Sequence, residues 1–272
     1  MMLTDELYES VKDIWKGYHE HPFVNGIGDG SLPIEKFRFY MLQDYLYLYD
    51  YAKVFALGVV KSTEPSMIRR FSYFVEDTLG GEMDIHSGYM ERLGITDEEV
   101  ARAAKSLANA SYTSYMLEVG FRGNELDILV AILSCAWSYA EIGRKLAEKY
   151  PDAVNHPFYG EWVKGYTSKE YNDMNNEILY LVNTLGDGIG RKRVEELKEM
   201  ARICNKVPQY PAESWWEALQ CVHFLRAATA LIEGMDSHSL GRFDQYMLPY
   251  LRKDLAAGKI TRKKAQQLLE CL

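Results

Sequence analysis

The segment FYMLQDYLYLYDYAK, residues 39–53, decides the fold. Neither Gly nor Pro interrupts it, and its apolar positions continue as far as Val59, so the pattern predicts one long helix. Asp44 and Tyr47 are three residues apart and Tyr51 follows four residues later, a spacing that puts a carboxylate beside phenols on one helix face.

A carboxylate among aromatic side chains suits a flat, nitrogen-rich ring. The aromatic rings can stack on the faces of such a ring, and the carboxylate can accept hydrogen bonds from an amino group on its edge. The alternative is an amphipathic helix whose tyrosines only cap a hydrophobic core. On this segment alone both interpretations stay open.

The rest of the chain also predicts helices. A loop is expected over residues 26–33, and Gly80-Gly81 is expected to interrupt a helix that begins at Pro65. Asn124 opens a strongly apolar helix over residues 126–146. Alternation with period two is nowhere sustained, so the sequence predicts an all-α protein.

Composition excludes several classes of partner. The 272 residues carry a net charge of −8, which argues against nucleic acid and anionic membranes as partners. No run of eighteen apolar residues is present, so no membrane span is expected. Residues 1–9 lack a basic, apolar signal region, and the cysteines Cys135, Cys204, Cys221 and Cys271 form no C-x-x-C pair. Both features indicate a reducing cytoplasm.

No metal or cofactor is expected. Glu82 and His86 are four residues apart and could share a metal, but the paired Glu-x-x-His motifs of di-iron bundles are missing. The glycine-rich stretch at residues 26–30 follows no predicted strand, which argues against a dinucleotide-binding loop.

A series of motifs in residues 1–187 resembles, in order, the thiaminase II (TenA) family. They are His21 to Pro33, Leu42-Gln43-Asp44, Glu82 to His86, Ser111 to Met116, Cys135 to Gly143, and His156 to Tyr159 followed by Trp162 and Tyr166. The resemblance implies an all-helical bundle like that of haem oxygenase, and a homotetramer. It also implies cleavage of thiamin, or hydrolysis of aminomethyl-pyrimidine to hydroxymethyl-pyrimidine, for thiamin salvage.

The resemblance also assigns roles to residues of this sequence. Cys135 would be the nucleophile that adds to the pyrimidine ring, and Asp44 would hold the amino edge of the ring. The tyrosines that would line the pocket are Tyr47, Tyr112, Tyr139 and Tyr166. Without the resemblance, a lone cysteine in an apolar helix is more often a structural residue than a nucleophile.

The sequence changes character near Gly190. Residues 191–272 resemble an internal segment of glycyl radical enzymes, the pyruvate formate-lyase superfamily, especially over Gly241 to Tyr246. We therefore expect a TenA-like bundle over residues 1–190 and a helical segment over residues 191–272 that partly completes it. Cys271 and Gly258 are not in the sequence contexts of the radical cysteine and glycine, so radical chemistry is not expected.

The join affects a residue that the TenA family uses. Its last helix carries a Glu that faces the pyrimidine and passes a proton to the leaving group, and matching Trp215-Trp216 to the family's Phe-Trp pair puts Ala212 at that position. Glu213 and Glu217 are the remaining candidates for a proton shuttle, although one residue of offset turns Glu213 by about 100°. The helix from about Ala212 to Ile232 is expected to dock into the bundle.

Three hypotheses follow for the function. The first is an aminopyrimidine aminohydrolase of the thiaminase II type, with activity reduced by the replaced helix. The second is a protein that binds the pyrimidine without turning it over. The third is a fusion or scaffold protein.

Overall fold

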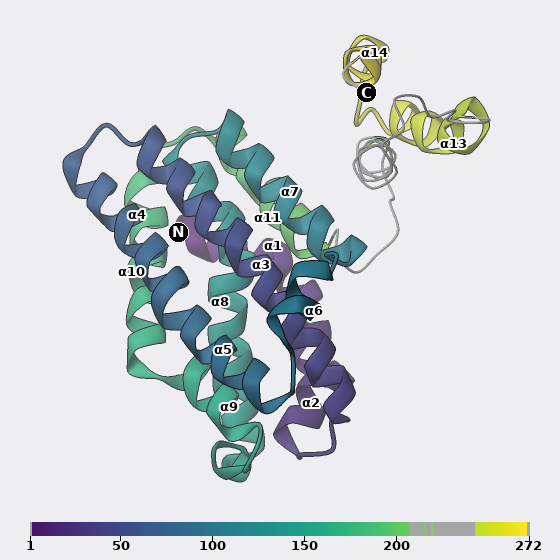
Figure 1. Cartoon of the computed structure of the whole chain (residues 1–272). Helices are drawn as coiled ribbons and strands as arrows, with labels where there is room; N and C mark the ends of the chain where they lie inside the picture. The colour runs from purple at the N-terminus through teal and green to yellow at the C-terminus, as the bar shows by residue number, and fades with distance from the viewer. Residues whose placement is uncertain (1, 207–214, 216–218, 220–242, 271–272) are drawn as a thin grey trace. The chain divides into compact units, whose positions relative to one another are not determined.

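The computed structural model describes residues 2–206, 215, 219 and 243–270, and every element in these residues is a helix (Figure 1). The predicted all-α class is therefore confirmed. The elements are α1 (Leu3–Glu20), α2 (Pro22–Gly28), α3 (Ile34–Lys61), α4 (Pro65–Asp77), η1 (Thr78–Glu82), α5 (Met83–Arg92), α6 (Asp97–Arg102), α7 (Leu107–Arg122), α8 (Glu125–Lys149), η2 (Pro151–Asn155), α9 (Gly160–Thr167), α10 (Lys169–Leu185), α11 (Arg191–Lys206), α13 (Phe243–Ala256) and α14 (Arg262–Glu270).

The chain divides into two compact units, Met1–Pro208 and Gln209–Leu272. The first unit thus continues past the expected junction near Gly190 and includes α11. Helices α3 and α8 form its centre, since α3 packs against α4, α5 and α7, and α8 packs against α9, α10 and α11. The stretch that decided the sequence interpretation lies in α3, which is 28 residues long.

Helix α8 is the most deeply buried helix of the bundle. Its N-terminus has a capping box: the Asn124 side chain accepts hydrogen bonds from the Leu126 and Asp127 amides, at 3.1 and 3.2 Å, and the Asp127 carboxylate accepts one from the Asn124 amide at 2.9 Å. Among the described helices α8 is apolar and long enough to cross a membrane, but 72% of its 18-residue apolar stretch is buried inside the protein. It is therefore the core helix of the bundle.

The expected loop over residues 26–33 is partly wrong. Helix α2 begins at Pro22, with the His21 ring accepting from the Phe23 amide at 3.2 Å, and it runs through Gly26 to Gly28. Glycine is needed there because a Cβ on Gly28 would lie 2.2 Å from the ring of Tyr150. These glycines therefore allow close packing inside a helix instead of making a loop.

The expected interruption at Gly80-Gly81 takes a specific form. The backbone does not leave the helix but widens into a π-helical turn, η1, which joins α4 directly to α5. Such turns occur often at functional sites because they shift the direction of the side chains around them. Here the turn ends at Glu82 and precedes the helix that carries His86.

Helix α11 packs against α1, α7 and α8. Its inward face is formed by the buried side chains of Val194, Leu197, Ala201, Ile203 and Cys204. Near its end, Asn205 accepts a hydrogen bond from the Trp15 indole at 2.8 Å through its side chain and one from the Tyr18 hydroxyl at 2.8 Å through its carbonyl. Arg193 pairs with the buried Asp127 of α8.

Most of the helix expected over residues 212–232 lies outside the described residues. Its described side chains, Trp215 and Leu219, are buried with Met247 and Ala265 in the core of the second unit. The expected docking of this helix into the bundle stays a prediction. Helix α11 already presents an apolar face to α1 and α8.

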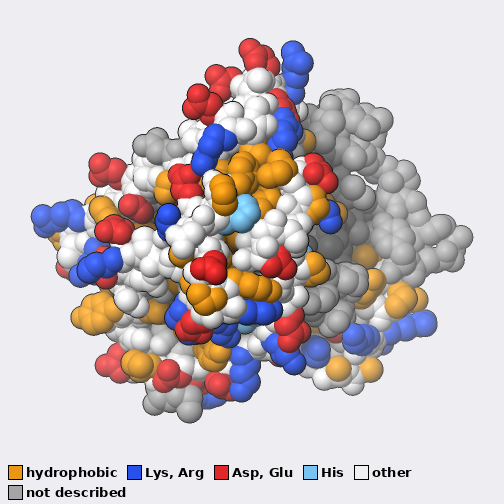
Figure 2. Space-filling view, turned by 90° about the horizontal axis from the view of Figure 1, so that it is seen from below, with side chains coloured by type: hydrophobic (Ala, Val, Ile, Leu, Met, Phe, Trp, Pro, Cys, Tyr) orange, Lys and Arg blue, Asp and Glu red, His pale blue; other side chains and the backbone are white. Residues whose placement is uncertain are grey.

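One face of the protein carries charged side chains of both signs (Figure 2). On the face shown in Figure 2, acidic side chains are interspersed with basic ones, and hydrophobic side chains gather around a histidine near its upper centre. Two signs mixed in this way do not form the continuous basic stripe that binds nucleic acid.

We expect a chain that ends after Gly190 to lose cooperative thermal unfolding. Removing α11 exposes the apolar surface that Leu197 and Ala201 cover, at about 25 cal/mol per Å², and leaves the Trp15 indole without its acceptor. A chain that ends after Pro208 keeps α11 and should unfold cooperatively. Equal melting temperatures for the two chains, followed by circular dichroism, would show that α11 contributes nothing.

Candidate active site

The predicted site residues that the structure describes lie in one buried cluster at the centre of the first unit. Asp44 and Tyr47 come from α3, Tyr112 from α7, Cys135 and Tyr139 from α8, and Tyr166 from α9. The cluster is one electrostatic unit, because the charge of Asp44 bears on the pKa values of Cys135, Tyr139 and Tyr166.

One side of the cluster is a stack of tyrosines. The rings of Tyr47 and Tyr112 lie nearly parallel with centroids 5.7 Å apart, and Tyr51 stacks on Tyr47 at 5.2 Å. The Tyr112 hydroxyl shares a hydrogen bond with the Ser134 hydroxyl. The Tyr47 hydroxyl is buried and makes no hydrogen bond of standard geometry among the described residues, and its neighbour is the Cys135 thiol, whose pKa it lowers.

The other side is formed by α8, α9 and α10. The Tyr139 and Tyr166 rings lie 4.7 Å apart, and Trp162 packs edge-on against Tyr166, also at 4.7 Å. Tyr171 meets Tyr166 edge-on at 5.0 Å and donates to the Ala136 carbonyl at 3.2 Å. Burial raises the pKa of each of these tyrosines well above its usual value, so the phenols stay protonated and can donate.

Cys135 lies deep in this cluster. Burial is the main cause that raises the pKa of its thiol, and the negative charges of Glu82 and Asp44 raise it further. The hydroxyls of Tyr47 and Tyr51 lower this pKa, but by less. The resting group is therefore a neutral thiol, and a positive charge must arrive before the thiolate can form.

Asp44 is held by a chain of hydrogen bonds. Its Oδ2 accepts from the Tyr40 hydroxyl at 2.9 Å and faces His86 Nε2 at 2.7 Å. The Trp162 indole donates in turn to the Tyr40 oxygen at 3.2 Å. The carboxylate is thus connected to α5 on one side and to α9 on the other.

Glu82 brings a second carboxyl group to the site. Burial is the main cause that raises the pKa of Glu82 to about 7, and the negative charges of Asp44 and Asp77 add to this rise. The positive charge of His86 acts in the opposite direction and lowers the pKa. His86 is 4% exposed, and its Nδ1 lies 2.9 Å from the Glu82 carbonyl oxygen. Because its protonation changes near neutral pH and its charge bears on the Cys135 thiol, Glu82 is a candidate proton acceptor for this site.

Sequence reasoning missed the roles of Tyr40, Glu82 and His86. Glu82 to His86 was included in a family motif and Glu82 and His86 were weighed as a possible metal site, but neither residue was given a role in the chemistry. Within the described chain no group of three or more His, Cys, Asp or Glu side chains is placed to hold a metal. A usable signal was the spacing of Tyr40 and Asp44, which are four residues apart on one helix. Glu213 and Glu217, the predicted proton shuttles, lie outside the described residues.

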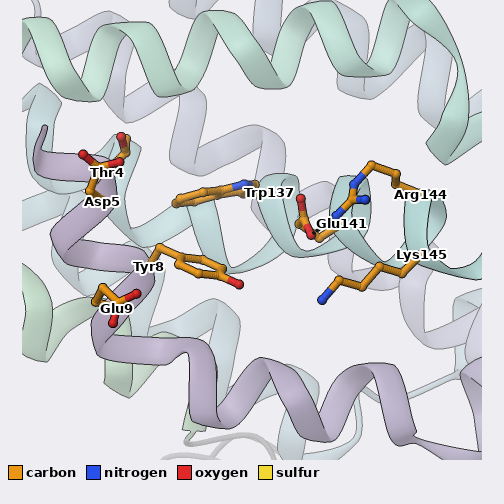
Figure 3. Close-up of a pocket in the computed structure, with 8 residues that line it drawn as sticks. All are labelled: Thr4, Asp5, Tyr8, Glu9, Trp137, Glu141, Arg144 and Lys145. Carbon is orange, nitrogen blue, oxygen red and sulfur yellow. Dashed lines mark hydrogen bonds and ion pairs between the residues drawn. The ribbon is translucent and has the colours of Figure 1, made fainter.

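A separate, open pocket lies on the surface between α1 and α8 (Figure 3). The rings of Tyr8 and Trp137 lie 5.7 Å apart there, and Arg144 pairs with Glu141 at 2.8 Å. Its lining residues are Thr4, Asp5, Tyr8, Glu9, Trp137, Glu141, Arg144 and Lys145. It contains none of the predicted site residues.

Comparison with known proteins identifies the family. The profile of the TENA/THI-4/PQQC family matches residues 8–220. The chain belongs to this family. A second profile, described as pyruvate formate lyase-like, matches residues 172–272, which is the part of the chain that resembles glycyl radical enzymes. The two matches overlap over α10 and α11, so the join between the families does not coincide with a boundary of the fold.

Relatives in the family include characterised enzymes. The chain is 46% identical to the aminopyrimidine aminohydrolase of Helicobacter pylori over 200 residues, which cover 74% of this chain and 92% of the relative. It is 44% identical to the enzyme of the same name from Halalkalibacterium halodurans over 198 residues, which cover 73% and 88%. A solved TenA homologue from P. horikoshii superposes with a TM-score of 0.68 at 29% identity, over 83% of this chain and 99% of that one. The predicted haem oxygenase-like bundle is confirmed.

We expect Glu82→Gln to change how stability depends on pH. Because the pKa of Glu82 is about 7 in the folded protein and 4.5 when unfolded, the unfolded chain loses this proton first, and the free energy of unfolding falls between those pH values. The variant should lack this decline and be more stable at pH 8 by on the order of 1–3 kcal/mol.

The measurement is urea unfolding at pH 4, 6 and 8. Glu161→Gln is the control, because Glu161 forms a half-exposed ion pair with Arg92 and carries no buried charge. If the stabilities of Glu82→Gln and the wild type run parallel from pH 4 to pH 8, Glu82 does not titrate near neutral pH.

Proposed function

We propose that the chain is an aminopyrimidine aminohydrolase of the thiaminase II type. It would replace the C–N bond of thiamin or of an aminomethyl-pyrimidine by a C–O bond from water and release hydroxymethyl-pyrimidine for thiamin salvage. The observation that carries the proposal is the buried cluster of Asp44, Cys135 and tyrosines, found in a chain that is 46% identical to an aminopyrimidine aminohydrolase.

The arrangement of the cluster supports a binding mode. A pyrimidine ring that enters beside Cys135 would meet aromatic faces on both sides, Tyr47 and Tyr112 on one and Tyr139 and Tyr166 on the other. Asp44 would accept a hydrogen bond from the amino group and favour protonation of a ring nitrogen. The positive charge on the ring would then lower the pKa of the Cys135 thiol, which the free protein keeps neutral.

The chemistry would proceed through a covalent intermediate. The Cys135 sulfur adds to the activated ring and gives up its proton, and the amine leaves with a proton as its C–N bond breaks. Water then adds to the carbon that lost the amine, and the C–S bond breaks, which restores the Cys135 thiol and releases the alcohol. Glu213 or Glu217 remains a proposed source of the leaving-group proton. Among the described residues, Glu82 is the carboxyl group suited to take up the thiol proton, because burial holds its pKa at about 7.

The binding-protein hypothesis differs from this one in a measurable way. A protein that only binds the pyrimidine would show affinity without product, whereas the hydrolase would release hydroxymethyl-pyrimidine over many turnovers.

We further propose that the protein is a cytoplasmic homotetramer that needs no cofactor. The free thiols of Cys135 and Cys204 support the reducing compartment, and membership of the family supports the assembly.

We expect Cys135→Ser to abolish turnover and to leave ring binding nearly intact, because oxygen is close in size to sulfur but a far weaker nucleophile at this position. Cys204→Ser is the control: Cys204 lies on α11 and is buried, whereas Cys135 is half-buried, and replacement of Cys204 should keep turnover. Product release by chromatography is the measurement. Undiminished product from Cys135→Ser would remove the nucleophile from the mechanism.

We expect Asp44→Asn to weaken aminopyrimidine binding by about ten- to hundredfold, because a hydrogen bond to a charged acceptor contributes about 1.5–3 kcal/mol. Asp50→Asn is the matched control on the same helix, where the carboxylate pairs with Lys53 and Lys105 instead of facing the cluster. Calorimetry gives both dissociation constants. An unchanged constant for Asp44→Asn would place the ring away from Asp44.

A further inference from the structure

Each ring nitrogen of His86 lies within hydrogen-bond distance of an oxygen that accepts hydrogen bonds. Nδ1 lies 2.9 Å from the Glu82 carbonyl oxygen and Nε2 lies 2.7 Å from Asp44 Oδ2. A carbonyl oxygen can only accept, so Nδ1 carries a proton. A neutral ring would then point the lone pair of Nε2 at the Asp44 oxygen, which is repulsive at this distance. The contact between the two groups therefore needs a second proton.

We propose that His86 is a positioning residue that acts through Asp44, as a buried imidazolium that fixes the carboxylate for the pyrimidine. This inference rests on the proposed function, in which Asp44 receives the amino edge of the ring. His86 itself does not touch the ring. It supplies Asp44 with a hydrogen bond and with a compensating charge at a largely buried position.

The geometry determines which oxygen remains for the substrate. Oδ2 of Asp44 accepts from His86 and from Tyr40, and Tyr40 is itself held by the Trp162 indole. These two bonds fix the plane of the carboxyl group and occupy one oxygen. Oδ1 is left to accept from a ring amino group, which selects an aminopyrimidine over a ring that presents a carbonyl there.

The charges around His86 determine the pH range of the pair. Asp44 faces it from α3 and Glu82 from the end of η1. Burial, the largest influence, lowers the pKa of His86, but the hydrogen bond to Asp44 and the charges of Asp44 and Glu82 raise the pKa to about 9 overall. The pair is therefore intact at neutral pH and is lost as the pH rises through about 9.

The test uses His86→Gln in the full chain. Glutamine can still donate to Asp44 but cannot carry a charge, so the substitution separates the hydrogen bond from the proton. We expect kcat/KM to fall by about ten- to hundredfold and its alkaline limb near pH 9 to disappear. His19→Gln is the matched control, a half-buried histidine on α1 that should leave both quantities unchanged.

A second measurement does not depend on turnover. In the free wild-type chain, nitrogen NMR of the histidine rings should show one doubly protonated ring that titrates near pH 9, and this signal should be missing from His86→Gln. In Asp44→Asn, the His86 ring should titrate at a clearly lower pH than in the wild type, because the charge that raises its pKa is removed while the burial remains.

The outcomes separate the two proposals. Absence of wild-type turnover would contradict the proposed function, while the NMR titration would still test the pair. An ordinary titration of every histidine would overturn the pair, as would a His86→Gln variant with wild-type kcat/KM and an unchanged alkaline limb. If His86→Gln fails to fold, the shift of His86 in Asp44→Asn decides the question.

Discussion

The contact between the Asp44 carboxylate and the His86 ring is the constraint on which the rest of the site depends. At 2.7 Å, and with His86 only 4% exposed, the two groups cannot both be neutral hydrogen-bond acceptors and must hold a proton between them. This hydrogen bond joins the middle of α3, which carries Asp44, to α5, which carries His86. The π-helical turn η1, which ends at Glu82, brings α5 to α3 in the register that the contact needs.

Burial explains why so many tyrosines surround one thiol. In water-excluded surroundings the phenols keep their protons, so they act as hydrogen-bond donors and as flat walls without adding charge. The carboxyl groups of Asp44 and Glu82 make the thiolate of Cys135 unfavourable in the empty site. Under the proposed function, a substrate that brings its own positive charge would remove this obstacle and would confine reactivity to the occupied site.

The helical elements and most of the site could be predicted from the sequence because they depend on local patterns. The apolar spacing of residues 39–59 predicts α3, and Asn124 marks the start of α8. The family resemblance pointed to Asp44, Cys135 and the tyrosines, which the structure brings together. The π-helical turn was not predictable, because two glycines indicate a break and do not show that the helix continues. The perturbed pKa of Glu82 arises from burial by other helices, which a linear pattern does not contain.

The C-terminal third shows the limit of reasoning from resemblance. The segment that resembles glycyl radical enzymes was expected to complete the bundle in part, through residues 212–232. Helix α11, which lies in the matching region, packs on α1 and α8 with a buried Leu197. An amphipathic helix of suitable length can fill such a position whatever its origin, since packing needs an apolar face of the right spacing more than a specific sequence.

The most direct test of the central claim is a crystal structure of the Cys135→Ser variant with an aminomethyl-pyrimidine bound. We expect the ring between Tyr47 and Tyr139, with its amino group at Asp44 Oδ1 and with His86 still bonded to Oδ2. A ring bound instead in the surface pocket beside Tyr8 and Trp137, or a His86 turned away from Asp44, would contradict the claim that this buried pair organises the site.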